Sequence, residues 1–261
     1  MNRRNLAIII VIALVAVAAL IWSTTSGSSA LTKYDNVLLS PSFASQLSVP
    51  NALLAQVGIG ASGNFPGKLT KPLLTLNGKP EIIYIGSEYC PYCATERWPM
   101  IIALSRFGTF GNLHYMTSSP TDVAPSTPTF TFYNSTYQSS YITFIAREMQ
   151  TNMLVNGTYP TLQVLNTTEN NMIAKLDVGG GIPFINFANK SALSGATYSP
   201  LVLQNMNWSQ IITQIYLTNS TISQSILGSA NLLTAQICRA TNNTPANVCM
   251  QSYIQKIEAF A

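Results

Sequence analysis

One short segment constrains the fold of this chain more than any other: an apolar strand pattern that runs directly into two closely spaced cysteines. Residues 82–85 are isoleucines and a tyrosine, which favours a buried strand. A Gly-Ser turn signal follows, and Cys90 and Cys93 stand at the start of a helical pattern. Pro91 suits the first turn of that helix, because its missing N–H would have no partner there.

The position of this cysteine pair predicts a redox-active disulfide. Cys90 would stand at the helix N-terminus, where unpaired amides and the helix dipole stabilise a thiolate. Cys93 would lie on the same helix face and can close a disulfide with it. We therefore expect Cys90 to attack and Cys93 to be the more buried resolving thiol. The alternatives are half of a zinc site, which needs two more ligands, and an inert structural bridge.

The other two cysteines, Cys238 and Cys249, flank a Thr-Asn-Asn-Thr-Pro turn between two helical patterns. A disulfide there would close a short loop and contribute ~3 kcal/mol in the chain-entropy model, so we predict a structural disulfide. The alternatives are a second redox pair that relays electrons to Cys90 and Cys93, or a zinc site made of all four thiolates. The spacing is not that of a zinc knuckle, and the sole histidine, His114, is not at ligand spacing. We expect no metal and no cofactor, because the dithiol itself would carry the electrons.

The N-terminus predicts export. An unbroken apolar run covers residues 6–22 after two arginines, which is the short end of the range for a membrane-spanning helix. Residues 1–30 would be a single membrane anchor and linker, and residues 31–261 an extracytoplasmic domain with a C-terminal helical segment. A cleaved signal peptide, which would leave a secreted protein, is the alternative.

Composition agrees with a folded exterior domain. Hydrophobic residues make up 47% of the chain and charged residues only 8%, which favours a packed core over disorder. The net charge of +4 is spread without a basic stripe, which argues against nucleic-acid binding. Paired cysteines and many Asn-x-Ser/Thr sequons are typical of a glycosylated protein in an oxidising compartment. The sequons begin at Asn134, Asn156, Asn166, Asn189, Asn207, Asn219 and Asn242.

The remaining pattern predicts a mixed α/β domain. Residues 72–76 and 81–85 resemble two strands joined by an Asn-Gly turn. A helix over 91–107 and a strand over 113–117 would complete a β-α-β unit with parallel strands. We further expect a hairpin of 129–133 with 141–145, a strand at 185–187, partly helical structure over 38–57, and helices over 162–176, 208–217, 222–238 and 245–259.

The strand, the Cys-Pro-Tyr-Cys motif and the helix together resemble the thioredoxin superfamily, and the Pro-Tyr dipeptide is the one that glutaredoxins use. Residues 86–98, GSEYCPYCATERW, are similar to a family of archaeal exported proteins of unassigned function with a thioredoxin-like core. That likeness extends to residues 182–185 and to the C-terminal cysteines. It implies a thioredoxin-like core with inserted hairpin and helical segments.

The superfamily also implies a cis-proline opposite the dithiol, where the preceding residue's backbone pairs with the substrate. Pro183 enters a predicted strand and is our choice for that role. Pro160, in a Tyr-Pro-Thr string that resembles disulfide isomerases, is the alternative, although it could simply start a helix. An ordinary trans-proline at Pro183 is the other possibility. The substrate-binding residues would be Ile182, Pro91 and Tyr92.

Two positions depart from the superfamily pattern. Thioredoxins bury a carboxylate six residues before the first cysteine, and this chain has Tyr84 there, so proton transfer to and from Cys93 would need another group. Glu88 is nearest in sequence, although a solvated loop carboxylate is an equally good interpretation. The proline that kinks the active-site helix in thioredoxins has only a displaced counterpart, Pro99.

The helix after the cysteines carries two further charged residues. Arg97 would share a face with Cys93 and could stabilise a thiolate, although we favour a solvated helix residue. We expect Glu96 to complement the first turns of the helix and Trp98 to be part of the core.

The sequence as a whole predicts an extracytoplasmic thiol–disulfide oxidoreductase. Cys90 would form a mixed disulfide with an exported substrate protein, and Cys93 would resolve it. A membrane redox partner, quinone-linked or thiol-donating, would restore the pair. The alternative is a non-catalytic envelope or surface module with two structural disulfides. Oxidase, reductase and isomerase stay open, because the potentials of this motif span about 150 mV.

Overall fold

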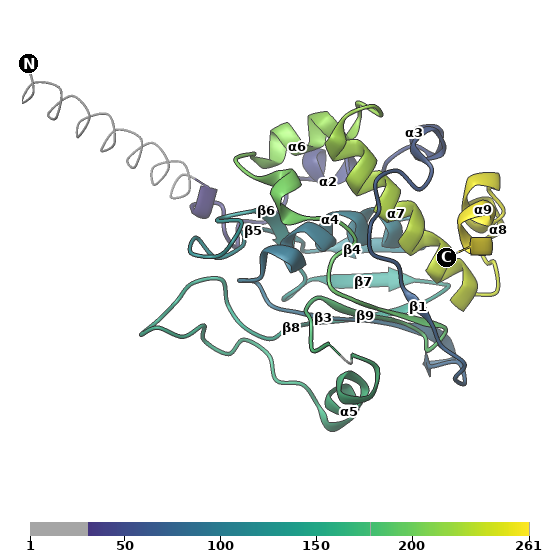
Figure 1. Ribbon diagram of the computed structural model, residues 1–261, viewed down its shortest axis with the longest axis horizontal. Helices are drawn as coiled ribbons and strands as arrows, with labels where there is room; N and C mark the ends of the chain where they lie inside the picture. Colours follow the sequence, from purple (N-terminus) through teal and green to yellow (C-terminus); the bar gives the residue numbers. More distant parts are fainter. Residues whose placement is uncertain (1–30, 178, 261) are drawn as a thin grey trace, which may run out of the picture.

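The computed structural model describes residues 31–177 and 179–260, and it folds as a mixed α/β unit around a mixed sheet (Figure 1). The predicted anchor at residues 6–22 lies outside these residues. Within them, no helix combines the length and hydropathy needed to cross a bilayer.

Strand β3 (Lys79–Gly86) is the centre of the main sheet. It pairs in parallel with β8 (Thr143–Glu148) and antiparallel with β9 (Phe184–Phe187). The sheet continues from β9 through β10 (Ser191–Ser194) to β1 (Gly67–Lys68), and β2 (Thr75–Leu76) pairs with the start of β3. The predicted Asn-Gly hairpin before β3 is thereby confirmed.

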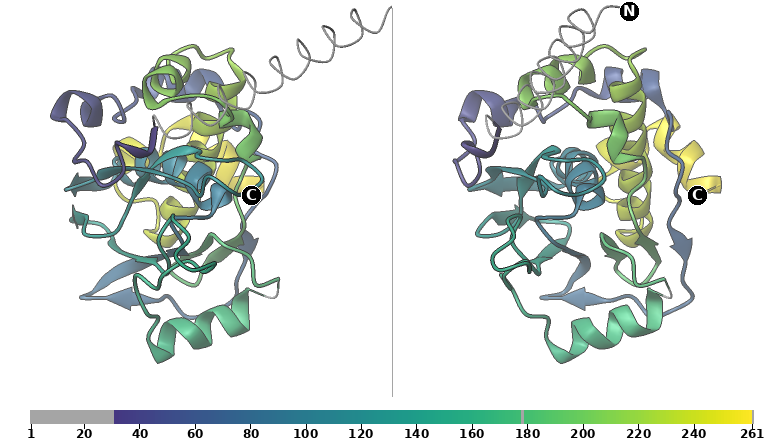
Figure 2. Two further views of the ribbon diagram at one scale, coloured as in Figure 1. Left: turned by 90° about the vertical axis from the view of Figure 1, so that its left-hand side faces the viewer. Right: turned by 60° about the vertical axis from the view of Figure 1, so that its left-hand side comes forward.

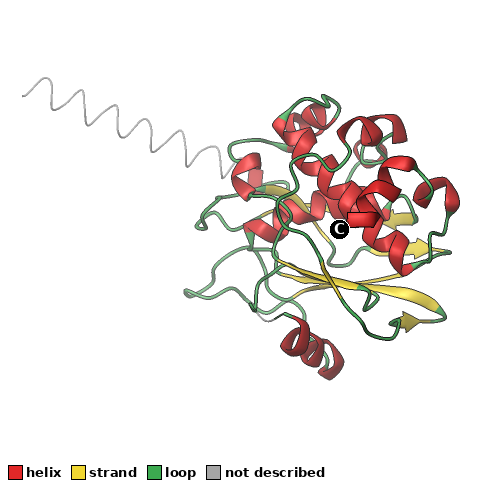
Figure 3. Cartoon of the chain, turned by 45° about the vertical axis from the view of Figure 1, so that its right-hand side comes forward, coloured by secondary structure: helices red, strands yellow, loops and turns green. Residues whose placement is uncertain are grey.

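Both faces of β3 are buried because its side chains alternate between two apolar layers. Ile82 and Tyr84 point to the larger core, and Ile83 and Ile85 point to a smaller cluster on the other face. Helices α4 (Pro91–Leu104) and α7 (Thr221–Ala240) cover the first face, and α5 (Thr167–Leu176) covers the second (Figures 1, 2 and 3). Helix α5 begins later than predicted, because Asn166 and Glu169 form a capping box at its start.

The remaining elements surround this sandwich. They are α2 (Pro41–Ser45), α3 (Asn51–Val57), β4 (Gly108–Gly111), β5 (His114–Thr117), β6 (Pro128–Thr131), β7 (Thr136–Ser139), the 3-10 helix η1 (Pro200–Leu203), α6 (Trp208–Ile215), α8 (Ala246–Cys249) and α9 (Ser252–Phe260). The predicted helix over 245–259 is therefore divided in two.

Two predicted strand pairings are wrong. Strand β5 does not pair with β3; it pairs antiparallel with β6 in a separate ribbon, and β4 pairs with β7 in another. The position beside β3 is taken by β8, whose Phe144 and Ile145 supply apolar side chains to the two faces of the sheet. The parallel crossover from β3 thus includes α4 and both ribbons, and the predicted hairpin of 129–133 with 141–145 does not form.

The C-terminal disulfide forms as predicted. Cys238 at the end of α7 is bonded to Cys249 in α8, and both residues are fully buried in the main core. This bond holds α8 and α9 against α7, at the right of Figure 1.

Candidate functional site

The register of the central strands brings distant residues to one edge of the sheet. Strand β3 leads into the cysteine helix, and β9 runs antiparallel to it with Ile85 opposite Phe184. The residues just before β9 must therefore lie beside the end of β3. Accordingly, the Cys90 thiol donates to the carbonyl oxygen of Ile182 at 3.7 Å. The Ile182–Pro183 peptide bond is cis, as predicted, and the Tyr159–Pro160 bond is not.

The two cysteines are free thiols in the predicted helix N-terminal geometry. Cys90 is the N-cap of α4, and its Sγ accepts a hydrogen bond from the Cys93 N–H at 3.4 Å. Cys90 is 6% exposed and Cys93 is fully buried. A hydrogen bond from the Cys93 thiol lowers the pKa of Cys90, whereas burial raises the pKa of Cys93 well above its ordinary value. The more acidic thiol is therefore also the more accessible one.

Arg97 is not the solvated helix residue we favoured. It is fully buried and forms a bidentate pair with Glu148 at the end of β8, with Nη2 and Nε 2.6 and 2.8 Å from the two carboxylate oxygens. Its Nη2 also donates to the carbonyl oxygen of Ser87. Arg97 contributes to the lowered pKa of Cys90, which agrees with the alternative role as a thiolate-stabilising cation.

The two neighbouring glutamates also lie inside the protein. Glu88, for which a solvated carboxylate was an equal alternative, is 3% exposed and accepts a hydrogen bond from Thr131 Oγ1 at 2.7 Å. Burial raises its pKa to about 7. Glu96 does not complement the helix start as we predicted. It is fully buried and accepts hydrogen bonds from the N–H and hydroxyl of Thr197, and burial raises its pKa to about 7. Trp98 is fully buried, as predicted.

The predicted substrate-binding residues differ in accessibility. Tyr92 is 45% exposed and Ile182 is half-buried, and both adjoin Cys90. Pro91 is buried at the first turn of α4 and offers no surface. The structure therefore favours Tyr92 and Ile182 as the contact surface and assigns Pro91 to the helix start.

The loop that contains Pro160 lies on another side of the dithiol. Tyr159 stacks on Tyr89, the residue before Cys90, with ring centroids 4.2 Å apart, and its hydroxyl donates to Ser119. The Glu88 N–H donates to the carbonyl oxygen of Gln150 in the same loop. Sequence reasoning considered Pro160 in this loop as the alternative cis-proline, but it missed the stacking of Tyr159 on Tyr89, and it missed Glu148. The available signal was weak: one glutamate follows an arginine after a short apolar run, and one tyrosine precedes a proline.

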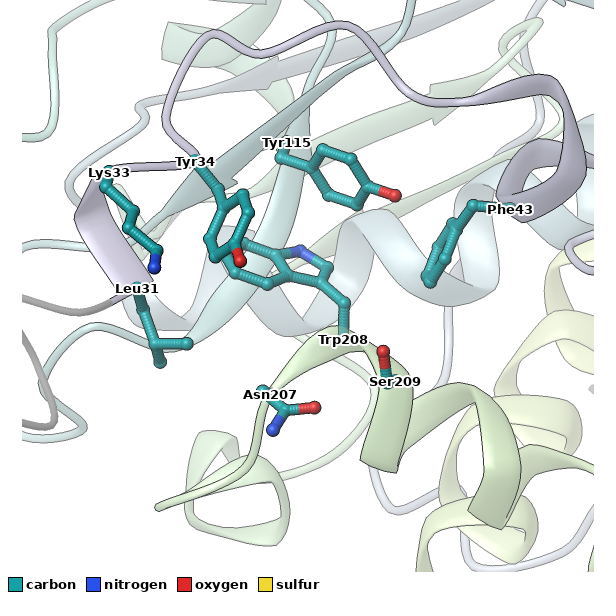
Figure 4. Close-up of a pocket in the computed structure, with 8 residues that line it drawn as sticks. All are labelled: Leu31, Lys33, Tyr34, Phe43, Tyr115, Asn207, Trp208 and Ser209. Atoms are coloured by element: carbon teal, nitrogen blue, oxygen red, sulfur yellow. The ribbon is translucent and has the colours of Figure 1, made fainter.

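A separate pocket of about 420 Å³ lies where the described chain begins (Figure 4). Tyr34 and Tyr115 pack edge to face on Trp208, with ring centroids 5.7 and 5.2 Å away. The pocket is lined by Leu31, Lys33, Tyr34, Phe43, Tyr115, Asn207, Trp208 and Ser209. Since these rings join the segment after residue 30 to β5 and α6, we assign the pocket a structural role.

Comparison with known proteins gives one match. A family model described as a domain of unknown function (DUF929) matches residues 68–239, which include β3, α4 and the Ile182–Pro183 segment. No curated protein and no solved structure matches the chain significantly.

Proposed function

The chain belongs to the DUF929 family, whose description assigns no activity, and we propose from the site itself that it is a thiol–disulfide oxidoreductase with a thioredoxin-like core. One observation carries the proposal: the Cys90 thiol caps a helix N-terminus and contacts the backbone of Ile182, with Cys93 buried behind it. Cys90 is therefore the less buried and more acidic of two thiols that lie within reach of each other.

The chemistry follows from the unequal pair. The Cys90 thiolate attacks one sulfur of a substrate disulfide, forms a mixed disulfide and releases the other substrate sulfur as a thiolate. The Cys93 thiolate then attacks Cys90 Sγ, closes the Cys90–Cys93 disulfide and releases the second substrate sulfur. Two electrons pass to the substrate. The reverse sequence oxidises a substrate dithiol, so one site serves either direction.

The surface around Cys90 suits an extended polypeptide. The segment that leads into β9 lies at the end of the sheet where β3 finishes, and its Ile182 carbonyl faces the Cys90 sulfur. A substrate strand that placed its own sulfur at Cys90 would run alongside this backbone and reach the exposed Tyr92 ring. Exported proteins with accessible cysteines are the substrate class we propose.

We further propose an extracytoplasmic location, with residues 1–30 as anchor and linker and a membrane partner that restores the dithiol or disulfide. A closed Cys238–Cys249 bond agrees with an oxidising compartment. Asn134, Asn156, Asn166, Asn219 and Asn242 are exposed, so five of the predicted glycosylation sequons are open to modification.

The deciding experiment is a redox titration of the purified domain of residues 31–261. The oxidation state of both cysteine pairs is followed by alkylation and mass spectrometry. A Cys90–Cys93 potential above about −200 mV supports an oxidase or isomerase, and one near −270 mV supports a reductase. In parallel, a Cys93→Ser chain should trap a disulfide-bonded peptide on Cys90, and a Cys90→Ser chain should trap none. If the reduction potentials of both pairs lie below about −300 mV and no peptide is trapped, the proposal is wrong and a non-catalytic module with two structural disulfides takes its place.

A further inference from the structure

The hydroxyl of Tyr84 is buried in the interior without a hydrogen-bond partner among the described residues. Its ring lies between Phe132, at 5.0 Å between centroids, and the Arg97 guanidinium, at 5.8 Å. Buried hydroxyls are nearly always paired, so an unpaired one at the centre of a sheet requires an explanation. No structural hydrogen bond accounts for a tyrosine instead of a phenylalanine at this position.

The missing side chain of Gly86 shows what the hydroxyl faces. A Cβ at that position would collide with the Tyr84 hydroxyl and would stand 3.0 Å from Cys93 Sγ. Glycine therefore leaves a small space into which both the hydroxyl and the buried thiol point. In the dithiol state no hydrogen bond of ordinary geometry joins the two groups, although their side chains interact.

The groups that act on Cys93 come from three elements. Cys90 and Arg97 lie on its own helix, Tyr84 lies on β3, and Glu148 lies on β8. Glu148 forms a bidentate pair with Arg97. Arg97 lowers the pKa of Cys93, and Glu148 raises it. Arg97 Nη1, like the tyrosine hydroxyl, has no partner among the described residues. Both unpaired donors thus belong to side chains that interact with Cys93.

We propose that Tyr84 is a positioning residue for the resolving thiol: its hydroxyl donates a hydrogen bond to Cys93 Sγ when that sulfur becomes a thiolate. The inference rests on the proposed function, since only a reacting Cys93 needs to ionise. Burial raises the pKa of Tyr84 well above its ordinary value, so the hydroxyl keeps its proton and acts as a donor, not as a base.

The step that Tyr84 assists is resolution of the mixed disulfide. The Cys93 thiolate attacks Cys90 Sγ; the Cys90–Cys93 bond forms as the bond from Cys90 to the substrate sulfur breaks. The substrate leaves as a thiolate and takes up a proton, which balances the proton that Cys93 lost. Without the hydroxyl, the Cys93 thiolate would form in the protein interior with one hydrogen-bond donor fewer, which makes the buried charge more costly.

The test compares Tyr84→Phe with Tyr198→Phe in the full chain. Tyr198 is a matched control, because it is also buried but donates a structural hydrogen bond to the carbonyl oxygen of Thr95 on α4, the helix that contains Cys93. In a Cys90→Ser background, the pKa of Cys93 is read from its Cβ chemical shift by NMR. We expect Tyr84→Phe to raise that pKa by about one unit and Tyr198→Phe to leave it unchanged.

Kinetics provide a second readout with Cys90 present. Tyr84→Phe should lengthen the lifetime of the mixed disulfide about tenfold below the Cys93 pKa, with an unchanged pH profile for alkylation of Cys90. Its thermal midpoint should stay constant or rise, because an unpaired hydroxyl is removed, whereas Tyr198→Phe should lower it.

An unchanged Cys93 pKa in Tyr84→Phe overturns the inference and leaves the proposed function standing if the wild-type chain still exchanges disulfides. A raised Cys93 pKa supports the hydrogen bond even if the wild-type chain lacks exchange activity, which would overturn the proposed function alone. If Tyr84→Phe fails to fold, the ring signals of Tyr84 in the Cys90→Ser chain decide. They should titrate together with Cys93, and signals that do not follow it refute the contact.

Discussion

The two cysteine pairs of this chain have the same side chains but lie in contrasting surroundings. Cys238 and Cys249 are bonded to each other inside the main hydrophobic core, between α7 and α8. Cys90 and Cys93 are free thiols at a helix N-terminus, outside the two apolar clusters. The first pair is fully buried as a closed disulfide, whereas the second has one slightly exposed thiol, Cys90, and one fully buried thiol, Cys93.

The difference teaches that charge placement, not burial, separates the two pairs. All four sulfurs are buried, but only the N-terminal pair has an arginine, a glutamate and an unpaired tyrosine hydroxyl around it. A helix N-terminus and a nearby cation favour a thiolate, and an apolar core disfavours one. Each prediction below changes one side of this contrast.

Replacing Cys90 by serine should have the largest effect. We expect disulfide exchange to fall by about 10⁴-fold or more, because the attacking sulfur is lost and Cys93 is fully buried. The thermal midpoint should change little, because the N-cap hydrogen bond to the Cys93 N–H passes to the serine hydroxyl. Exchange is measured with a disulfide-bonded peptide and stability by thermal melting. A large loss of stability without a loss of exchange would assign this pair a structural role.

Arg97→Met should be the next largest change. It leaves Glu148 unpaired in the interior, which typically costs about 3–5 kcal/mol of folding free energy. It should also raise the pKa of Cys90, since Arg97 favours the thiolate. Chemical denaturation and the pH profile of Cys90 alkylation measure the two effects.

Arg147→Met provides the control for that variant. Arg147 also pairs with a glutamate, Glu169 at 2.9 Å, but its side chain is 30% exposed. Surface ion pairs contribute about 0–1 kcal/mol of folding free energy, so this variant should lose little stability. It should also leave the pH profile of Cys90 alkylation unchanged. Equal losses in the two arginine variants would show that the buried pair has no special importance for the dithiol.

The dithiol helix and its strand could be predicted because their signals are local. An apolar run, a turn and Cys-Pro-Tyr-Cys specify β3, the N-cap position of Cys90 and the burial of Cys93 without information from the rest of the chain. The placement of Pro183 was also within reach, because an antiparallel strand after it brings its start to the end of β3. The partly helical structure predicted over 38–57 forms as α2 and α3.

The surroundings of the dithiol could not be predicted, because they depend on pairing between distant segments. Glu148 meets Arg97 only because β8, and not β5, lies parallel to β3. Both strands are short mixtures of polar and apolar residues, and no local feature of either sequence indicates which strand it pairs with. The errors for Glu96 and Arg97 have the same origin: a charged residue on a helix is normally solvated unless a distant partner buries it.

Removing the C-terminal disulfide tests the other half of the contrast. The Cys238→Ala, Cys249→Ala double variant should lose about 3 kcal/mol of stability and retain full exchange activity. Loss of hydrogen-exchange protection should concentrate in α8 and α9, which the bond holds to α7. A fall in turnover at unchanged stability would instead favour the electron-relay interpretation.

The smallest predicted effect is a pH dependence of stability that arises mainly on the dithiol side. Burial raises the pKa of Asp35 to about 6, and those of Glu88 and Glu96 to about 7. Each carboxyl therefore holds its proton more tightly in the folded chain than in the unfolded one. The resulting stabilisation is complete below about pH 4, falls as pH rises through 6–7, and is lost above the folded pKa values. Thermal melts between pH 5 and 8 should show a falling midpoint, and the free energy of unfolding should fall by a total on the order of a few kcal/mol.

Glu88→Gln and Glu96→Gln should flatten the pH dependence of the midpoint, because an amide cannot ionise. The double alanine variant of the C-terminal cysteines should lower the midpoint at every pH and keep the same slope. A midpoint that rises from pH 5 to 8 would mean that these carboxyls are ionised in the folded chain, and the contrast between a titrating dithiol region and a pH-insensitive disulfide would then be withdrawn.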